Sequence, residues 1–220
     1  MSISPAKFNI AFEKAKQVIQ MLSNKHPRKD YIFLDEIVCA VKQISGFAEI
    51  SITRHPFSGL ELSKEVKSST SLSCGAMLGV MTRFNPIENK RDRIAYLSVN
   101  AEQNATMQRF AIVHELGHLI MYTPNYSYWK VDNKKYTIST HVHDDITILS
   151  ENERFSDQYL FAEQMSNIFA VLVLVPRNIN IRDVKGHGME RLIKEFGVSE
   201  ATIYSRMLLS SIFFESITSV

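Results

Sequence analysis

Apolar residues recur at every third or fourth position over the first part of the chain, which is the spacing of one face of an α-helix. Two segments have this pattern, residues 6–23 and residues 32–44. Their in-phase apolar residues are Phe8, Phe12, Ala15 and Ile19 in the first segment and Phe33, Ile37, Val41 and Ile44 in the second. The sequence therefore predicts a helical N-terminal part that covers residues 1–46.

The middle of the chain has the patterns of β-strands. Residues 48–55 and 93–100 alternate between apolar and polar, as in a strand that buries one face, and residues 76–84 form an apolar run that also suits a strand. Residues 59–75 are polar and are expected to form a loop, and residues 85–92 a turn.

Helical spacing then returns in a long helix that begins near Asn104, a favourable N-cap, and must end before Pro124. Residues 123–152 alternate as a β-hairpin does, which predicts a hairpin-like insertion. A further helix is expected from about residue 153 to residue 174.

The tail, residues 187–214, looks like a helix-turn-helix. Its two helices meet at "FGVS", where Gly197 ends the first helix and Ser199 caps the second. The residues expected to pack the tail against the rest of the chain are Leu192, Ile193, Phe196, Val198, Ile203 and Leu208. The succession of helices, strands and helices favours an α+β fold with a small antiparallel sheet, and 220 residues suit a single domain.

Composition gives no reason to expect nucleic acid or a membrane as a partner. The formal net charge is +2, which is nearly balanced. No apolar run is long enough to span a bilayer, and the first residues lack the basic and apolar segments of a secretory signal. Cys39 and Cys74 are too few for a disulfide framework and are expected to be packed free thiols, so a cytoplasmic protein is expected.

The stretch "AIVHELGHLIMY", residues 111–122, carries the candidate chemistry. On a helix, His114 and His118 lie one above the other, so both imidazoles can bind one metal ion. Glu115 lies about 100° around the helix, where it can accept a proton from a water that zinc activates. Gly117 has no side chain and lets another helix approach closely. The alternative is an ordinary buried helix with two incidental histidines.

A catalytic zinc site needs a third protein ligand, and Glu163 is the best candidate. Ser166 and Ala170 follow it on the same stripe and are small, so this helix can press against Gly117. Asn167, one turn after Glu163, is expected to hold the carboxylate in place. A solvated surface role for Glu163 is the alternative, and the rival ligands are His141, His143, Glu153 and Asp157.

These residues resemble the ImmA/IrrE family of zinc metallopeptidases, which are gluzincin-like. The resemblance covers roughly residues 93–208, through "AYLSVN", "QRFAIVHELGHL", "AEQMSNIFAVLVLVP" and "LIKEFGVSEATIYSRML". The residues in register with the family's Glu-to-Pro segment are Glu163, Ser166 (where alanine is usual), Asn167, Phe169, Ala170 and Pro176. About 45 residues separate His118 from Glu163, which is longer than in the family because of the 123–152 insertion.

The resemblance implies a zincin-like core with a helical C-terminal segment, one Zn2+ ion on His114, His118 and Glu163, and Glu115 as the general base. It implies a zinc metalloendopeptidase whose protein substrate is a helix-turn-helix repressor encoded nearby on a mobile element or in a stress-response circuit. The donor that stabilises the oxyanion stays open, and the candidates are Tyr122, Tyr128, His141, His143, Tyr204 and Arg206.

Two other functions have to be weighed. A DNA-binding regulator would read DNA with residues 199–213, but Arg206 is the one basic residue there among apolar ones, so direct nucleic-acid binding is not expected. A partner-sequestering regulator with a non-catalytic zinc site would have no use for Glu115. Because the 123–152 insertion lies between the second and third ligands, we expect it to gate the site, with a decorative surface hairpin as the alternative.

Overall fold

The computed structural model describes residues 5–25, 31–56, 76–85, 90–121, 138–139 and 153–212. In chain order the elements are α1 (Pro5–Lys25), α2 (Leu34–Ser45), β1 (Glu49–His55), β2 (Ala76–Asn85), β3 (Lys90–Asn100), α4 (Ala105–Met121), β4 (Ile138–Ser139), α6 (Glu153–Leu174), α7 (Ile181–His187), α8 (Met189–Phe196) and α9 (Glu200–Ile212). The predicted mixture of helices and strands is confirmed, and helix predominates among these residues.

The strands form one sheet in the order β1-β3-β2-β4. β2 pairs antiparallel with β3 and β4, but β1 pairs parallel with β3. The expectation of an antiparallel sheet is therefore wrong, because the sheet is mixed. β2 and β3 are close in sequence and pair as hairpin strands do, whereas the long connection over residues 57–75 allows β1 to lie on the other side of β3 and in the same direction.

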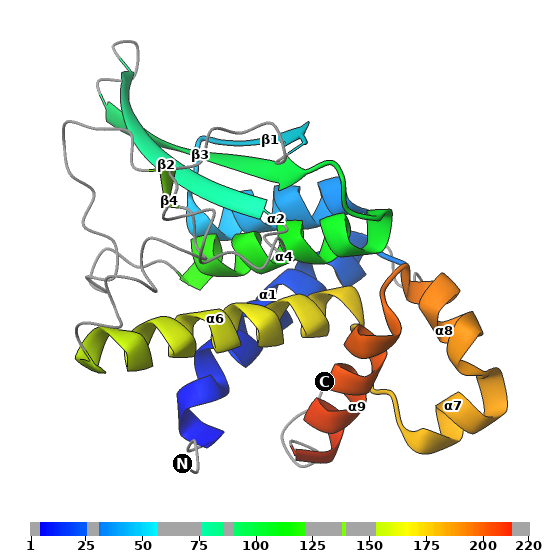
Figure 1. Cartoon of the computed structure of the whole chain (residues 1–220). Helices are drawn as coiled ribbons and strands as arrows, with labels where there is room; N and C mark the ends of the chain where they lie inside the picture. Colours follow the sequence, from blue (N-terminus) through cyan, green and yellow to red (C-terminus); the bar gives the residue numbers. More distant parts are fainter. Residues whose placement is uncertain are drawn as a thin grey trace.

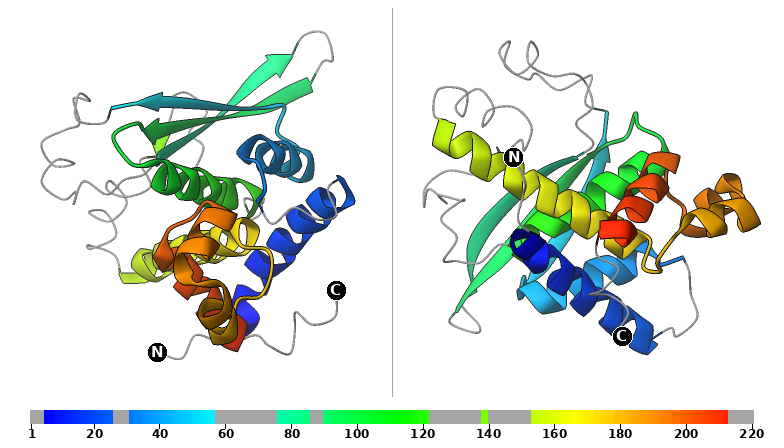
Figure 2. Two further views of the ribbon diagram at one scale, coloured as in Figure 1. Left: turned by 90° about the vertical axis from the view of Figure 1, so that its right-hand side faces the viewer. Right: turned by 90° about the horizontal axis from the view of Figure 1, so that it is seen from below.

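The sheet and the helices α1, α2, α4 and α6 stack in three layers, and α7, α8 and α9 lie beside them (Figures 1 and 2). The sheet lies on α4 and α2, and α1 and α6 form the next layer. In β3, Ala95, Leu97 and Val99 are fully buried and belong to the core, whereas Tyr96 between them is exposed. Because α4 is covered by the sheet on one side and by α6 on the other, most of its second half is buried.

The buried faces of α1 and α2 differ in part from the predicted ones. In α2, Ile37 and Val41 are fully buried as expected, but Phe33 is 54% exposed because it precedes the helix as its N-cap. In α1, the buried stripe consists of Ala11, Ala15, Val18 and Leu22. Of the predicted α1 residues whose side chains the structure describes, only Ala15 belongs to this stripe.

The start of α4 is as predicted, since Asn104 Oδ1 accepts a hydrogen bond from the backbone N–H of Met107 at 2.9 Å. Of the predicted insertion 123–152, only Ile138 and Ser139 lie within the described residues, and they pair with Gly79 and Leu78 of β2. The rest of that hairpin lies outside them, as do the loop 59–75 and residues 86–89.

The two helices of the tail are α8 and α9. Gly197 ends α8 in the left-handed conformation with φ 62°, and Ser199 Oγ accepts from the backbone N–H of Thr202 at 3.3 Å. The predicted packing of the tail is confirmed for the fully buried residues Leu192, Phe196, Val198 and Ile203, but it is wrong for Leu208, which is 62% exposed. α7 was not predicted, because its 7 residues are too few to show a periodic apolar face.

Two expectations based on composition can be compared with the structure. No helix in the described part of the chain is long and apolar enough to cross a membrane. Cys39 is exposed, so the expectation of a packed thiol is wrong there, and Cys74 lies outside the described residues.

Candidate metal centre

α4 and α6 pack together with almost no side chain between them at one point. A Cβ atom on Gly117 would lie 3.0 Å from Cδ1 of Phe169 and 3.1 Å from Cα of Ser166. Ser166 is fully buried. The close approach that the small residues predicted is therefore present, and it brings Glu163 of α6 to the face of α4 that carries the two histidines.

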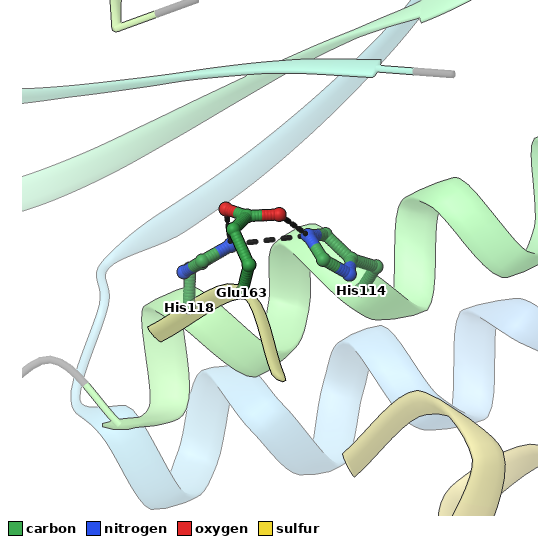
Figure 3. Close-up of side chains that lie close together, drawn as sticks. All are labelled: His114, His118 and Glu163. Carbon is green, nitrogen blue, oxygen red and sulfur yellow. Dashed lines mark hydrogen bonds and ion pairs between the residues drawn. The ribbon is translucent and has the colours of Figure 1, made fainter. Parts of the chain in front are cut away.

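Three side chains converge at this point, as Figure 3 shows. Nε2 of His114 lies 3.1 Å from Oε2 of Glu163, and Nε2 of His118 lies 3.0 Å from Oε1 of the same carboxylate. The two Nε2 atoms are 3.1 Å apart. The exposed fraction of the side chain is 12% for His114, 3% for His118 and 20% for Glu163, so the cluster is largely buried but still reaches solvent.

The spacing of these atoms fits a small metal ion. Ligand atoms at the corners of a tetrahedron with metal–ligand bonds of about 2.0–2.1 Å lie about 3.3–3.4 Å apart, close to the 3.0–3.1 Å separations in this cluster. The three ligand atoms lie within 4.8 Å of one another. Two imidazoles and one carboxylate suit zinc, but the same donors also accept iron or cobalt, so the cluster could hold a metal ion and its geometry does not select one.

Asn167 contacts a different residue from the one predicted. Asn167 was expected to hold the Glu163 carboxylate, but the ligand that its Oδ1 contacts is His114, at 3.0 Å from Nδ1. The reason is the geometry of α6: Glu163 extends toward the two Nε2 atoms, while Asn167, one turn further on, meets the opposite edge of the His114 ring.

Glu115 is the neighbouring carboxyl group of the cluster and is only 3% exposed. Its Oε2 is buried and has no hydrogen-bond partner in the part of the chain that the structure describes. Burial raises the pKa of Glu115 to about 8, an effect that His114 opposes and the charge of Glu163 reinforces. A cation bound in the cluster would favour the ionised form and lower this pKa.

The pKa values of the two histidines shift in opposite directions. Burial alone would lower the pKa of His114, but its hydrogen bond to Glu163 and the charges of Glu115 and Glu163 raise it above 6.5. Burial and the charge of His114 lower the pKa of His118. Burial opposes the charge of Glu163, but hydrogen bonds from both histidines outweigh it and lower its pKa.

Among the side chains that the structure describes, the cluster consists of His114, His118 and Glu163. Glu153 and Asp157 are on α6, but they precede Glu163 by about 15 Å and about 9 Å along the helix axis. His141 and His143 lie outside the described residues, as do the oxyanion candidates Tyr122 and Tyr128.

The two remaining oxyanion candidates are on α9. Tyr204 is 54% exposed. Arg206 donates to Val175 O at 2.9 Å, to Asn178 Oδ1 at 2.6 Å and to Ser210 Oγ at 2.8 Å. Burial lowers the pKa of Arg206 to about 10. Because these hydrogen bonds hold its guanidinium between the end of α6 and α9, Arg206 is a structural residue.

Comparison with known proteins does not assign this chain to a family. Neither a scan against protein-family models nor a search of curated proteins finds a match to this chain.

Proposed function

We propose that this protein is a zinc-dependent endopeptidase. The observation that carries the proposal is the convergence of His114, His118 and Glu163 beside the buried carboxyl group of Glu115. A structural metal site is closed by four protein ligands, whereas a catalytic one has three and an open position. Among the residues that the structure describes, the cluster supplies three ligands, and its side chains remain partly exposed.

Each residue of the site has a role in peptide hydrolysis. His114, His118 and Glu163 would hold the zinc ion, which when bound polarises a carbonyl group and lowers the pKa of a coordinated water to about 7. Glu115 accepts the proton of the attacking water and then donates it to the leaving amine. Its apolar surroundings suit a group that must change protonation state during the reaction.

The choice of zinc over iron rests on Glu115. Two histidines and one carboxylate also hold iron in oxygenases, but such a site has no use for a buried general base one residue after a ligand. A hydrolytic metal site needs that base. The resemblance of the "HELGH" and "AEQMSNIFA" motifs to the ImmA/IrrE metallopeptidases supports the same choice.

The substrate class follows from that resemblance alone. We propose a helix-turn-helix repressor protein as the substrate, so that cleavage relieves repression and the enzyme acts as an anti-repressor. Direct DNA binding by this chain is the less favoured function. DNA binding would need exposed basic residues on α9. The one basic residue of α9, Arg206, is buried against the end of α6.

The test combines metal analysis with cleavage. The purified full-length protein is expected to contain one zinc ion per chain and to cut the repressor encoded beside its gene, with the products identified by mass spectrometry. A chelator should stop cleavage and added zinc should restore it, while His114→Ala should lose both metal and activity. A protein that binds zinc and the repressor but leaves the repressor intact would be a sequestering regulator, contrary to the proposal.

A further inference from the structure

The face of α4 that carries the two histidines continues toward the start of the helix. Four residues spaced by four, three and four positions share this face, namely Met107, Ala111, His114 and His118. Exposure rises along it, from the buried His118 through the half-buried His114 to Met107, which is 45% exposed. The exposed end of this face is thus the end that lies nearest the beginning of α4.

The side chains at this exposed end are apolar. Ala111 and Phe110 are half-buried and pack against the core of the fold. The ring of Phe110 lies beside that of His114, with the two centroids 6.5 Å apart. Met107, Phe110 and Ala111 therefore form an apolar stripe that begins next to the metal centre and ends in solvent.

No charged side chain on this part of α4 competes with the apolar stripe. Between residues 105 and 113 the one charged residue is Arg109. Arg109 is buried, and its guanidinium donates a hydrogen bond to the backbone oxygen of Ile32 and lies over the Tyr31 ring. Its charge is therefore directed to the segment before α2, and the stripe offers apolar contact alone.

We propose that the apolar stripe is a substrate subsite, which receives an apolar side chain beside the bond that is cut. This inference rests on the proposed peptidase function. Ala111 precedes His114 by about 4.5 Å along the helix axis and Met107 precedes it by about 10.5 Å. An extended peptide advances about 3.3–3.4 Å per residue. A peptide with its scissile carbonyl at the metal thus places one of the three residues on one side of that bond over the stripe.

The stripe selects by the difference in hydration between apolar and charged side chains. An apolar side chain gains free energy when it leaves water, whereas a charged one loses hydration and finds no partner there. The flexible side chain of Met107 adapts to apolar groups of different shape. We therefore expect the enzyme to accept Leu, Ile, Met and Phe at this position and to reject Asp, Glu, Lys and Arg.

Cleavage of a proteome-derived peptide library by the zinc-loaded full-length protein, with the cut sites read by mass spectrometry, tests the inference. At one position within three residues of the cut bond, the parental protein should prefer apolar residues over charged ones by about tenfold or more. Met107→Lys should transfer this preference to Asp and Glu, and Met107→Glu should transfer it to Lys and Arg, because opposite charges attract across an interface.

Ile181→Lys is the matched control, because Ile181 is 56% exposed and begins α7, which lies beside the layers that contain α4 (Figure 1). This variant should keep the parental cleavage profile, and all four proteins should hold equal amounts of zinc. A parental profile without the apolar preference, or Met107 variants with the parental profile, would overturn the subsite.

Two further outcomes have distinct meanings. Loss of all cleavage by zinc-loaded Met107 variants would also overturn the subsite, since a subsite selects the substrate and does not carry out the chemistry. A parental protein that holds zinc but cuts no peptide in the library would instead overturn the proposed peptidase function, and this inference with it.

Discussion

Glu115 and Glu163 belong to one buried cluster, yet their pKa values shift in opposite directions. The pKa of Glu163 is lowered because two imidazoles donate hydrogen bonds to its carboxylate. The pKa of Glu115 is raised to about 8 because the attraction to His114 does not offset the cost of burying its ionised form. Such divergence separates a permanently ionised ligand from a group that exchanges protons. The shifts therefore agree with Glu163 as a metal ligand and Glu115 as the base.

Glu115→Gln should separate chemistry from metal binding. The amide has nearly the shape of the carboxyl group but cannot accept the proton of the attacking water, so we expect cleavage to fall by about 10²–10⁴-fold. Zinc content should remain at the parental level. Single-turnover cleavage of the repressor protein, with zinc measured on the same samples, checks both expectations. Parental rates in this variant would exclude Glu115 as the base.

Glu115 should also give the metal-free protein a pH-dependent stability. The folded protein retains a proton on Glu115 up to about pH 8, whereas the unfolded chain releases it near 4.5. Between these values the folded state binds the extra proton, so the free energy of unfolding falls as pH rises, by up to about 1.4 kcal/mol per pH unit.

Urea unfolding of metal-free parental and Glu115→Gln proteins across this window provides the measurement. Gln does not titrate, so the difference between the two proteins isolates the contribution of Glu115. The parental protein should lose stability relative to the variant as pH rises. A constant difference across the window would mean that Glu115 is ionised in the fold throughout.

At the scale of elements, the contact between α4 and α6 sets the geometry of the cluster. Each helix supplies part of the ligand set, and the helices approach closely because position 117 has no side chain. The sequence predicted this contact from Gly117 and the small residues of α6. It could not predict which atom Asn167 meets, because helical phase gives the face of a residue but not the rotamer that a neighbouring helix selects.

Gly117→Ala should therefore destabilise the protein although alanine favours helix. The added Cβ would meet the α6 backbone at Ser166 Cα, 3.1 Å away, which can yield only if the helix moves. We expect a net loss of about 1–3 kcal/mol, typical of overpacking, together with weaker zinc binding. Chemical denaturation and zinc titration measure the two effects.

Gly186→Ala is the matched control, because this glycine lies in α7 and a Cβ there would meet nothing within 4 Å. It should leave zinc binding unchanged and stabilise the protein by at most about 1 kcal/mol through helix propensity. If both glycine variants behave alike, the close helix contact has no bearing on the metal centre.

At the scale of the whole molecule, α4 is held from several sides. The tail is fixed to the end of α6 by Arg206, which spans Val175, Asn178 and Ser210. Arg109 of α4 lies over the Tyr31 ring at 4.4 Å, and a Cβ on Gly197 would lie 2.4 Å from Cε2 of the same ring. The segment before α2 thus contacts α4 directly, and the end of α8 lies against the same segment.

The sequence predicted most elements but not how they connect in space. Periodicity placed α4 and α6 almost to the residue, because caps and prolines mark their ends. The parallel pairing of β1 with β3 escaped prediction, since alternation shows that a strand has a buried face but not which neighbour it pairs with. Burial of Leu208 was wrongly expected for a similar reason. An apolar residue that follows the helical spacing of the other apolar residues is not buried unless another element covers it.

The central claim is that His114, His118 and Glu163 bind one zinc ion. Anomalous scattering from crystals of the zinc-loaded full-length protein, recorded on both sides of the zinc absorption edge, tests it directly. The account predicts one peak about 2.0–2.1 Å from Nε2 of His114, Nε2 of His118 and an oxygen of Glu163. A zinc peak held by His141 or His143, with Glu163 directed to solvent, would contradict it.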